Sequence, residues 1–416
     1  MLTILYPEVL QDIRLLPHGL LPIRRKDTDA LALAIKAPKE IILTAKIKKG
    51  FKFYVVPLAT NLGTTLGLVA AFFDDEDEPL VIKTPMFDDD LVGDLREILS
   101  YEKLDIYFFD EHCREWMSWR ANVRDGGSCL TDGTTWRLFE FTESRAQAAF
   151  KGLDHWFALR SARDDERAIS VTFVEELAPS DLLIVDLDPM GVDYLGSDGA
   201  NRSELVRERP GPYQERDIAT ALRRTFSGEQ VAINPLRADT NKEFSDGLAV
   251  SHKHLLIIQA KDSPNTELSL SRSLQRKRKA SGAHLEKGLR QAIGAAKHLR
   301  GRDTVELRID GERVDLPIGA REPFCAVVVK ELFADEGASY VAAVQTMANE
   351  GIRGVVLDYP AFHAFTHWLR EAELLMTALE DLQATALATG RYPDLHTFLA
   401  NFTAFGSQAR YPYGVP

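Results

Sequence analysis

Residues 243–262 read Glu-Phe-Ser-Asp-Gly-Leu-Ala-Val-Ser-His-Lys-His-Leu-Leu-Ile-Ile-Gln-Ala-Lys-Asp, and this stretch predicts how the C-terminal half of the chain folds. Two apolar segments flank a polar tip at 251–254, a pattern typical of a β-hairpin. The second segment, Leu255–Ile258, is a continuous apolar run, as expected for a strand that is covered on both faces. It leads directly into Gln259 and, two residues on, Lys261, at a position that we expect to be partly buried.

The geometry of this hairpin brings three polar side chains together. If the turn is centred on the His-Lys pair of the tip, Asp246 lies opposite Gln259. Side chains of a strand alternate between its two faces, so Gln259 and Lys261 point to the same side as Asp246. We therefore expect a carboxylate, an amide and an ammonium group at one end of an otherwise apolar sheet face.

These three side chains suit phosphodiester hydrolysis. Asp246 can hold a divalent cation, with help from the Gln259 side-chain oxygen and the Ala260 carbonyl. The cation acidifies a water molecule and stabilises charge on the phosphoryl oxygens, and Lys261 can orient or deprotonate that water or neutralise charge in the transition state. The alternative is a surface hairpin with an Asp–Lys ion pair at its rim.

The spacing of these residues resembles a known motif. Asp246, twelve intervening residues and then Gln259-Ala260-Lys261 are similar to the core of the PD-(D/E)xK phosphodiesterase superfamily, in particular to the Mrr-like branch with Gln at the second acidic position. The resemblance implies a restriction-endonuclease-like fold with Mg²⁺ or Mn²⁺ bound by Asp246 and Gln259. The sequence departs from the usual motif in having Ser245 where the family has Pro, and in its neutral Gln259, which leaves the number of bound metals open.

A helix predicted over residues 213–226 precedes the motif. Its periodicity places Ile218 and Leu222 on the inner face together with Glu215, whereas Asp217 is expected to fall off that face. A carboxylate that faces a core requires a partner. The first core helix of the family often carries such a Glu, so the resemblance implies Glu215 as a further catalytic and metal-binding group; the alternative is a Glu that interacts with the helix dipole and solvent.

Basic residues follow the motif. From Ser251 to Asp303 there are twelve Lys and Arg against four Asp and Glu, a local balance of +8 in a chain whose net charge is −12. Positive charge concentrated beside a hydrolytic site is expected to hold a phosphate backbone, although an ordinary solvated face is the alternative. The residues predicted to contact nucleic acid are Arg272, Arg276, Lys277, Arg278, Lys279 and, through the resemblance alone, Gln291 of the helix predicted over 283–299.

Length and composition bound the remaining possibilities. The 416 residues are 45% hydrophobic and 27% charged, which is ordinary for a globular protein with two domains. Apolar runs such as Leu66–Phe73 are far shorter than the ~20 residues of a membrane span, and the N-terminus lacks the features of a signal peptide. The three cysteines are widely spaced and predict neither disulfides nor a zinc site. We therefore expect a cytoplasmic protein that does not bind membranes.

The predicted organisation is of the α/β class with two domains. Residues 1–190 are expected to form an α+β domain with an interaction, dimerisation or target-sensing role, or with a purely structural one. Residues 204–416 are expected to form a restriction-endonuclease-like mixed sheet flanked by helices. The boundary lies in Asp186–Pro212, which is rich in Asp, Gly, Pro and Arg. Asp186 and Asp188 form a rival carboxylate pair, less favoured because no basic patch follows it.

The function predicted from these features is metal-dependent nuclease activity. DNA is favoured over RNA as the substrate, and the resemblance to Mrr-like proteins implies restriction or anti-phage defence. A homodimer would place two sites on one duplex, and the acidic N-terminal domain is expected to gate the nuclease by masking the basic patch or by sensing a trigger. Two alternatives are a catalytically inactive nuclease-fold protein that binds nucleic acid or a partner protein, and a structural or regulatory protein.

Overall fold

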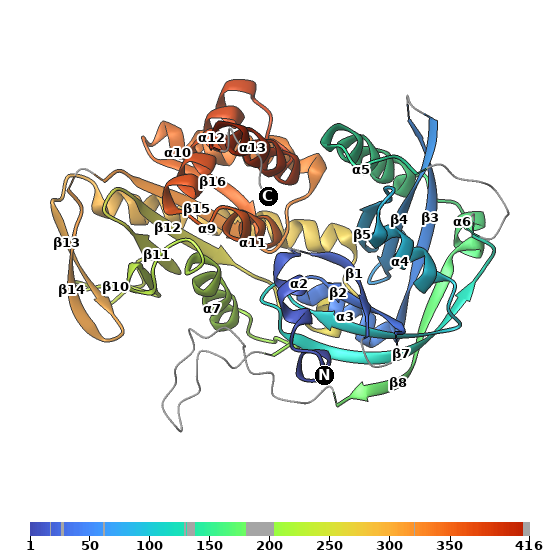
Figure 1. Ribbon diagram of the computed structural model, residues 1–416. Coiled ribbons are helices and arrows are strands. Elements are labelled where there is room, and N and C mark those ends of the chain that lie inside the picture. Colours follow the sequence, from blue (N-terminus) through green and yellow to red (C-terminus); the bar gives the residue numbers. More distant parts are fainter. Residues whose placement is uncertain are drawn as a thin grey trace. The chain divides into compact units, whose positions relative to one another are not determined.

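The computed structural model describes residues 1–16, 18–25, 29–60, 63–128, 130, 138–179, 204–319 and 321–410. The chain forms two compact units (Figure 1): Met1–Arg207 with Asn265–Arg272, and Glu208–Pro264 with Ser273–Pro416. The Asp186–Asp188 pair and most of the predicted boundary lie outside the described residues. No helix in the described part of the chain is long and apolar enough to cross a membrane.

The first unit is built on an eight-stranded mixed sheet in the order β1-β2-β6-β7-β8-β3-β4-β5. Only β2 and β6 pair in parallel; the other neighbours are antiparallel. Its strands are β1 (Gly19–Arg24), β2 (Leu31–Lys36), β3 (Gly50–Thr60), β4 (Gly63–Phe72), β5 (Leu80–Pro85), β6 (Lys103–Phe109), β7 (Glu115–Asp125) and β8 (Ile169–Ala178). Its helices are α1 (Leu2–Leu5), α2 (Val9–Leu15), α3 (Lys39–Lys48), α4 (Asp90–Leu99), α5 (Glu143–Ala158), α6 (Ala162–Arg167) and α8 (Glu267–Leu270).

A short segment that follows the motif in sequence belongs to the first unit. Asn265 is fully buried there, and its Nδ2 donates to the carbonyl oxygens of Leu205 (2.8 Å) and Lys39 (3.3 Å). Its main chain forms a β-bridge with Arg207, and Leu270 of α8 joins the hydrophobic core of the unit. The residues directly after the motif strand therefore interrupt the second unit before the chain returns to it.

The second unit contains a five-stranded sheet in the order β16-β15-β12-β11-β9. Its strands are β9 (Val231–Ile233), β11 (Gly247–Val250), β12 (Leu255–Lys261), β15 (Pro323–Val329) and β16 (Arg353–Asp358). The first three form an antiparallel meander, and β15 and β16 continue the sheet parallel to β12. Gly247 pairs with Ile258 and Val250 with Leu255, which is the register predicted for the hairpin.

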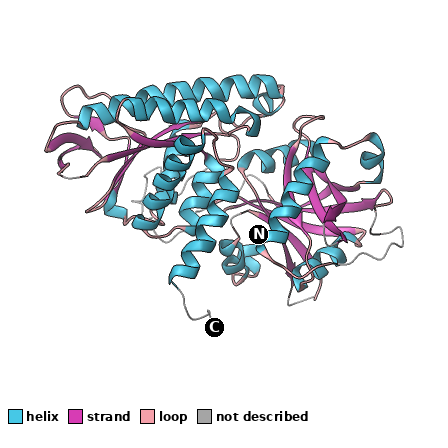
Figure 2. Ribbon diagram, turned by 90° about the horizontal axis from the view of Figure 1, so that it is seen from above, coloured by secondary structure: helices cyan, strands magenta, loops and turns pink. Residues whose placement is uncertain are grey.

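Helices cover both faces of this sheet (Figure 2). On one face Leu256 and Ile258 pack with α7 (Gly211–Leu222), α11 (Tyr359–Trp368), α12 (Ala372–Thr389) and α13 (Leu395–Arg410). On the other face Leu255 and Ile257 pack with α9 (Leu274–Leu299) and α10 (Gly337–Asn349). The apolar run of β12 is therefore buried on both sides, as its sequence predicted. The α/β class is confirmed.

Two helical predictions are corrected by the structure. The basic stretch Arg276–Lys279 is part of α9, which begins at Leu274 and not near residue 283. Lys, Arg and Gln are good helix formers and no Pro lies in this segment, so the helix extends back to Leu274, with Ser273 as its N-cap. The apolar residues over 362–387 have helical spacing and would predict a single helix, but the structure has two, because the chain turns after Trp368 and Arg370 Nε donates to the carbonyl of His367.

A second, three-stranded sheet extends from this unit. It pairs β10 (Leu236–Arg237) with the hairpin of β13 (Thr304–Ile309) and β14 (Glu312–Pro317). The hairpin turn is Asp310-Gly311, and both residues have positive φ (50° and 85°). Such angles are typical of the two-residue turns that suit the twist of a hairpin. This small sheet matters for the site because β10 fixes the chain segment that leads into Asp246.

Candidate active site

The polar end of β12 carries the predicted Asp–Lys pair. Lys261 Nζ lies 2.9 Å from Asp246 Oδ2, and the backbone N–H of Ala260 donates to the same oxygen over 2.6 Å. The two side chains are only 13% and 8% exposed. This is a largely buried ion pair, in which the Coulomb attraction is stronger than at a solvated surface.

Two oxygens converge on the Lys261 ammonium group. Besides the Asp246 carboxylate, Nζ contacts the carbonyl oxygen of Ala260 at 2.7 Å. Both are oxygens that the sequence analysis assigned to a divalent cation. A positive charge therefore already lies between these oxygens, and a metal ion would bind there only after the ammonium group moves away.

Gln259 lies beside this pair with a free acceptor. Its side chain is 2% exposed, and its Nε2 donates to the carbonyl of Phe244 at 3.3 Å. Its Oε1 is buried and accepts no hydrogen bond. A buried acceptor without a donor costs free energy, so such atoms are uncommon in folded proteins. An oxygen-seeking cation would satisfy it.

Glu215 reaches the same region from α7. It is half-buried, and Asn234 Nδ2 donates to its Oε2 over 2.6 Å. Burial raises the pKa of Glu215; the Asn234 hydrogen bond lowers it, the Asp246 charge raises it and the Lys261 charge lowers it. The carboxylate is therefore close enough to interact with both members of the ion pair. The expectation that Asp217 falls off the inner face is wrong: it is 6% exposed, because α7 is buried around more than a single stripe.

Asn234 was not predicted to take part. It follows β9 with φ of 48°, in the left-handed region that Asn tolerates better than most residues. Its backbone N–H donates to the carbonyl of Asp246 at 3.2 Å while its side chain holds Glu215. The Asn-Pro pair after a strand is a turn signal that could have drawn attention to this position.

Glu243 is a second residue that the sequence analysis missed. Its carboxyl group is hydrogen bonded to that of Asp246; this bond, burial and the Asp246 charge raise the pKa of Glu243 to about 7, against the charge of Lys261. The main chain at Glu243 forms a β-bridge with Leu236, and the next N–H, of Phe244, donates to the Pro235 carbonyl at 2.8 Å. In an extended strand, residues three apart face opposite sides, so the spacing from Asp246 gave no indication of this proximity.

The donor set fits a hard divalent cation. Carboxylate, amide and carbonyl oxygens are the ligands that Mg²⁺ and Mn²⁺ prefer. Within the described ranges, however, no three or more His, Cys, Asp or Glu side chains are arranged so that they hold a metal ion as they stand. The Lys261 ammonium group is the positive partner of Asp246 in this arrangement.

Helix α9 packs closely against the sheet near Lys261. A Cβ atom at Gly288 would lie 2.7 Å from Val327 Cγ1 and 3.8 Å from Lys261 Cγ, so glycine permits this approach. One turn earlier, burial lowers the pKa of His284, and the Lys261 charge lowers it further. One turn later, Gln291 is half-buried and its Oε1 is a buried acceptor without a donor. The predicted position of Gln291 is thus on the side of α9 that faces the sheet.

The predicted nucleic-acid contacts differ in their surroundings. Arg276 and Lys279 are exposed on the first turns of α9, and Lys277 is half-buried. Arg272 is exposed too but belongs to the first unit. Arg278 lies 2.5 Å from Asp335, and its guanidinium group lies 4.6 Å from the centre of the Phe333 ring. Arg278 is therefore bound within the protein, and the exposed cations are the ones free to meet a phosphate.

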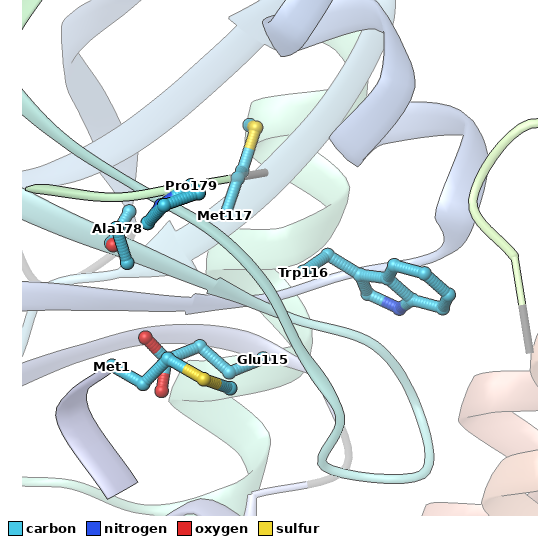
Figure 3. Close-up of a pocket in the computed structure, with 7 residues that line it drawn as sticks. Met1, Glu115, Trp116, Met117, Ala178 and Pro179 are labelled. Atoms are coloured by element: carbon cyan, nitrogen blue, oxygen red, sulfur yellow. The ribbon is translucent and has the colours of Figure 1, made fainter. Parts of the chain in front are cut away.

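Two hollows in the first unit offer no comparable chemistry. A cavity of about 10 Å³ lies among Met1, Glu115 and Pro179 (Figure 3), which is room for about one water molecule. An open hollow of about 540 Å³ is lined by Asp77, Glu78, Pro79, Val81, Lys83, Asp154 and Arg160. Its Lys83 and Asp154 side chains form an ion pair with each other. The Asp246 group remains the cluster with the most distinctive chemistry.

Comparisons with known proteins do not add to this description: no protein-family model and no curated protein matches the chain.

Proposed function

We propose that the second unit is a metal-dependent nuclease domain of the PD-(D/E)xK type that hydrolyses phosphodiester bonds of DNA. The observation that carries the proposal is the convergence of Asp246 Oδ2 and Ala260 O on one positive charge, beside the unsatisfied oxygen of Gln259. The order of elements supports it: helix α7, the antiparallel meander β9-β11-β12, the crossing helix α9 and the parallel strand β15. The motif family builds its core from this succession.

The residues have distinct roles in this proposal. Asp246, Gln259 and the Ala260 carbonyl would hold Mg²⁺ or Mn²⁺, with Glu215 nearby, and the bound cation would acidify water and stabilise phosphoryl charge. Lys261, released from Asp246 by rotation of its flexible stem, would orient the attacking water or neutralise the transition state. Asn234 keeps Glu215 in place through its 2.6 Å hydrogen bond.

The basic residues would position the substrate. Arg276 and Lys279 are exposed near the start of α9, and Lys287 is exposed on the same helix. Contacts of this kind bind the backbone of any sequence and weaken as salt rises. We extend the proposal to restriction or anti-phage defence, and to a homodimer that cuts both strands, on the basis of the resemblance to Mrr-like nucleases.

One observation favours a second candidate, a catalytically inactive nuclease-fold protein that binds nucleic acid or a partner protein. Gln259 is neutral, and the Lys261–Asp246 pair is closed and largely buried. An enzyme that had lost its metal could keep such a pair for stability. The exposed cations of α9 would then serve binding alone.

A cleavage assay separates the two candidates. The full chain is incubated with supercoiled, linear and single-stranded DNA and with RNA, in Mg²⁺, Mn²⁺ or EDTA, alongside Asp246→Asn and Lys261→Met. Glu312→Gln, an exposed Glu in β14, is the matched control. Metal-dependent cleavage that both site variants lose and the control keeps supports the nuclease. Salt-sensitive DNA binding without cleavage in any metal supports the binding protein.

The first unit would act as a sensor or restraint. Deleting residues 1–190 is a poor test, because Asn265 and Leu270 are packed in that unit and would lose their surroundings. Leu270→Ala in the full chain loosens the segment that follows Lys261 with less damage. If the first unit restrains the nuclease through this segment, cleavage increases; unchanged cleavage in a folded variant argues against such restraint.

A further inference from the structure

Helix α7 carries a polar side that the proposed metal site does not use. The buried residues of this helix are Gln214, Asp217, Ile218, Ala219, Ala221 and Leu222. Arg216, Thr220 and Arg223 lie outside this set and are half-buried. Residues four and seven positions apart on a helix share one side. The two arginines therefore project from the same side of α7, about 10.5 Å apart along its axis.

Neither arginine is neutralised within the protein. Among the described residues, no carboxylate lies within ion-pair distance of the Arg216 or Arg223 guanidinium group. The residue after Arg223 differs, because Arg224 Nη1 lies 2.9 Å from His363 Nδ1. The charges of Arg216 and Arg223 are therefore available to an anion from outside the chain.

The Tyr213 ring orients Arg216. The guanidinium carbon lies 5.0 Å from the centre of that ring, which is a cation–π distance. A side chain held in this way loses less conformational freedom when it binds a ligand. The planar guanidinium group matches the geometry of phosphate oxygens, and proteins that hold nucleic-acid strands combine such cations with aromatic rings.

The two arginines lie on the helix that leads into the candidate active site. Glu215, the residue before Arg216, accepts a 2.6 Å hydrogen bond from Asn234, whose backbone N–H donates to the Asp246 carbonyl at 3.2 Å. Helix α7 packs on the sheet face that carries Ile258, and α9 packs on the opposite face. The arginines of α7 and the exposed cations of α9 therefore flank the end of β12 from two sides.

We propose that Arg216 and Arg223 form a second surface for the DNA backbone, on the side of the active site opposite to α9. This inference rests on the proposed function and deepens it, because it names how the substrate is held. Successive phosphates of one strand are spaced about 3.4 Å along the duplex axis, so the two guanidinium groups can reach phosphates about three nucleotides apart. A strand held by both helices passes across Asp246 and Lys261.

Salt-dependent DNA binding by the full chain tests this surface without requiring cleavage. Fluorescence anisotropy with a labelled DNA duplex is measured in EDTA between about 50 and 200 mM salt, for the wild type, Arg216→Gln, Arg223→Gln and the double variant. Each phosphate contact contributes about 0.9 to the slope of log affinity against log salt. We expect each single variant to lower that slope by about one unit and the double variant by about two.

Two controls separate phosphate binding from other roles. Arg313→Gln removes an exposed arginine of β14 that is paired with Glu306 at 3.0 Å, and it should leave the slope unchanged. Arg216→Lys and Arg223→Lys keep the positive charge and should keep the wild-type slope. If the Gln variants lower the slope and the Lys variants do so as well, the arginines have a structural role and the inference is overturned.

The remaining outcomes distinguish this inference from the proposed function. If both Gln variants keep the wild-type slope while Arg276→Gln lowers it, DNA is held from the α9 side alone; the inference falls and the nuclease proposal stands. If the wild type shows no salt-dependent DNA binding, the nuclease proposal and this inference fall together.

Discussion

Replacing Lys261 by Met removes one member of the buried ion pair and keeps the apolar stem. Asp246 would then retain the N–H of Ala260 at 2.6 Å but lose its 2.9 Å contact with a positive charge. The carboxylate side chain is only 8% exposed, so water can replace the lost partner only in part. In the absence of metal we expect a clear loss of stability.

The magnitude follows from the burial. Breaking a buried ion pair at one end typically costs about 3–5 kcal/mol, and the remaining Ala260 hydrogen bond puts this pair at the lower end, about 3 kcal/mol. In a unit of about 200 residues each kcal/mol shifts the unfolding midpoint by about 2–4 °C. The midpoint of Lys261→Met in EDTA should therefore fall by roughly 6–12 °C.

A divalent cation should reverse much of this loss. Mn²⁺ would find Asp246 Oδ2 and the Ala260 carbonyl free of the competing ammonium group, so the variant should bind it at least as tightly as the wild type. Cleavage should nevertheless be absent, because the group that orients the attacking water is gone. Thermal unfolding followed by circular dichroism, with and without Mn²⁺, measures the recovery of stability. Calorimetry measures the affinity of the variant for Mn²⁺, and the cleavage assay described above measures its activity.

Lys287→Met is the matched control for stability alone, since this lysine is exposed on α9 and its loss should change stability by less than about 0.5 kcal/mol. The reasoning is refuted if Lys261→Met unfolds in EDTA at the wild-type temperature. It is also refuted if Mn²⁺ stabilises the wild type but not the variant, because the ammonium group would then support metal binding and not compete with it.

Three further predictions concern other parts of the molecule. Asn234→Ala loses the hydrogen bond to Glu215 and places Ala at φ of 48°, so we expect unfolding free energy to fall by about 2 kcal/mol in urea titrations; Asn234→Gly, which relieves the backbone strain, should recover about half. Burial raises the pKa of Glu111 from 4.5 to about 8. Between these pH values the unfolded chain has lost the Glu111 proton and the folded protein has kept it, so the free energy of unfolding should fall as pH rises from about 4.5 to about 8 and then level off. Glu111→Gln should remove this slope when unfolding is measured from pH 5 to 9. Arg276→Gln should lower the salt dependence of DNA binding by about one unit, whereas Arg278→Gln should change stability and leave that slope unaltered, as measured by fluorescence anisotropy across salt concentrations.

Local patterns predicted much of the second unit. The apolar run of β12 and the tip at 251–254 each depend on neighbouring residues, and the structure has both. The sequence predicted fewer of the structural elements of the first unit. Strand β7 was not predicted, and the residues that precede it, Asp110 to Arg114, are mostly charged or polar.

Two of these residues, Asp110 and Arg114, form a buried ion pair with each other. Arg114 Nε and the Trp116 indole N–H both donate to Asp110 Oδ2, at 2.6 and 2.8 Å. Mutual hydrogen bonds of this kind remove most of the cost of burying charge. The periodicity of apolar residues does not predict such a network, because its members can be identified only from the positions of their side chains in the folded protein.

Some contacts of the candidate site could likewise be predicted from local sequence patterns, and others could not. The sequence by itself determined that Asp246 and Lys261 meet, because a hairpin register is set by a short turn and a strict alternation of side chains. Only the tertiary structure decided that Glu243 joins them and that Asn234 holds Glu215. Glu243 depends on the β-bridge to Leu236, and Asn234 on its left-handed backbone conformation after β9. Both features form when chain segments pack against each other, and the pattern of neighbouring residues does not predict them.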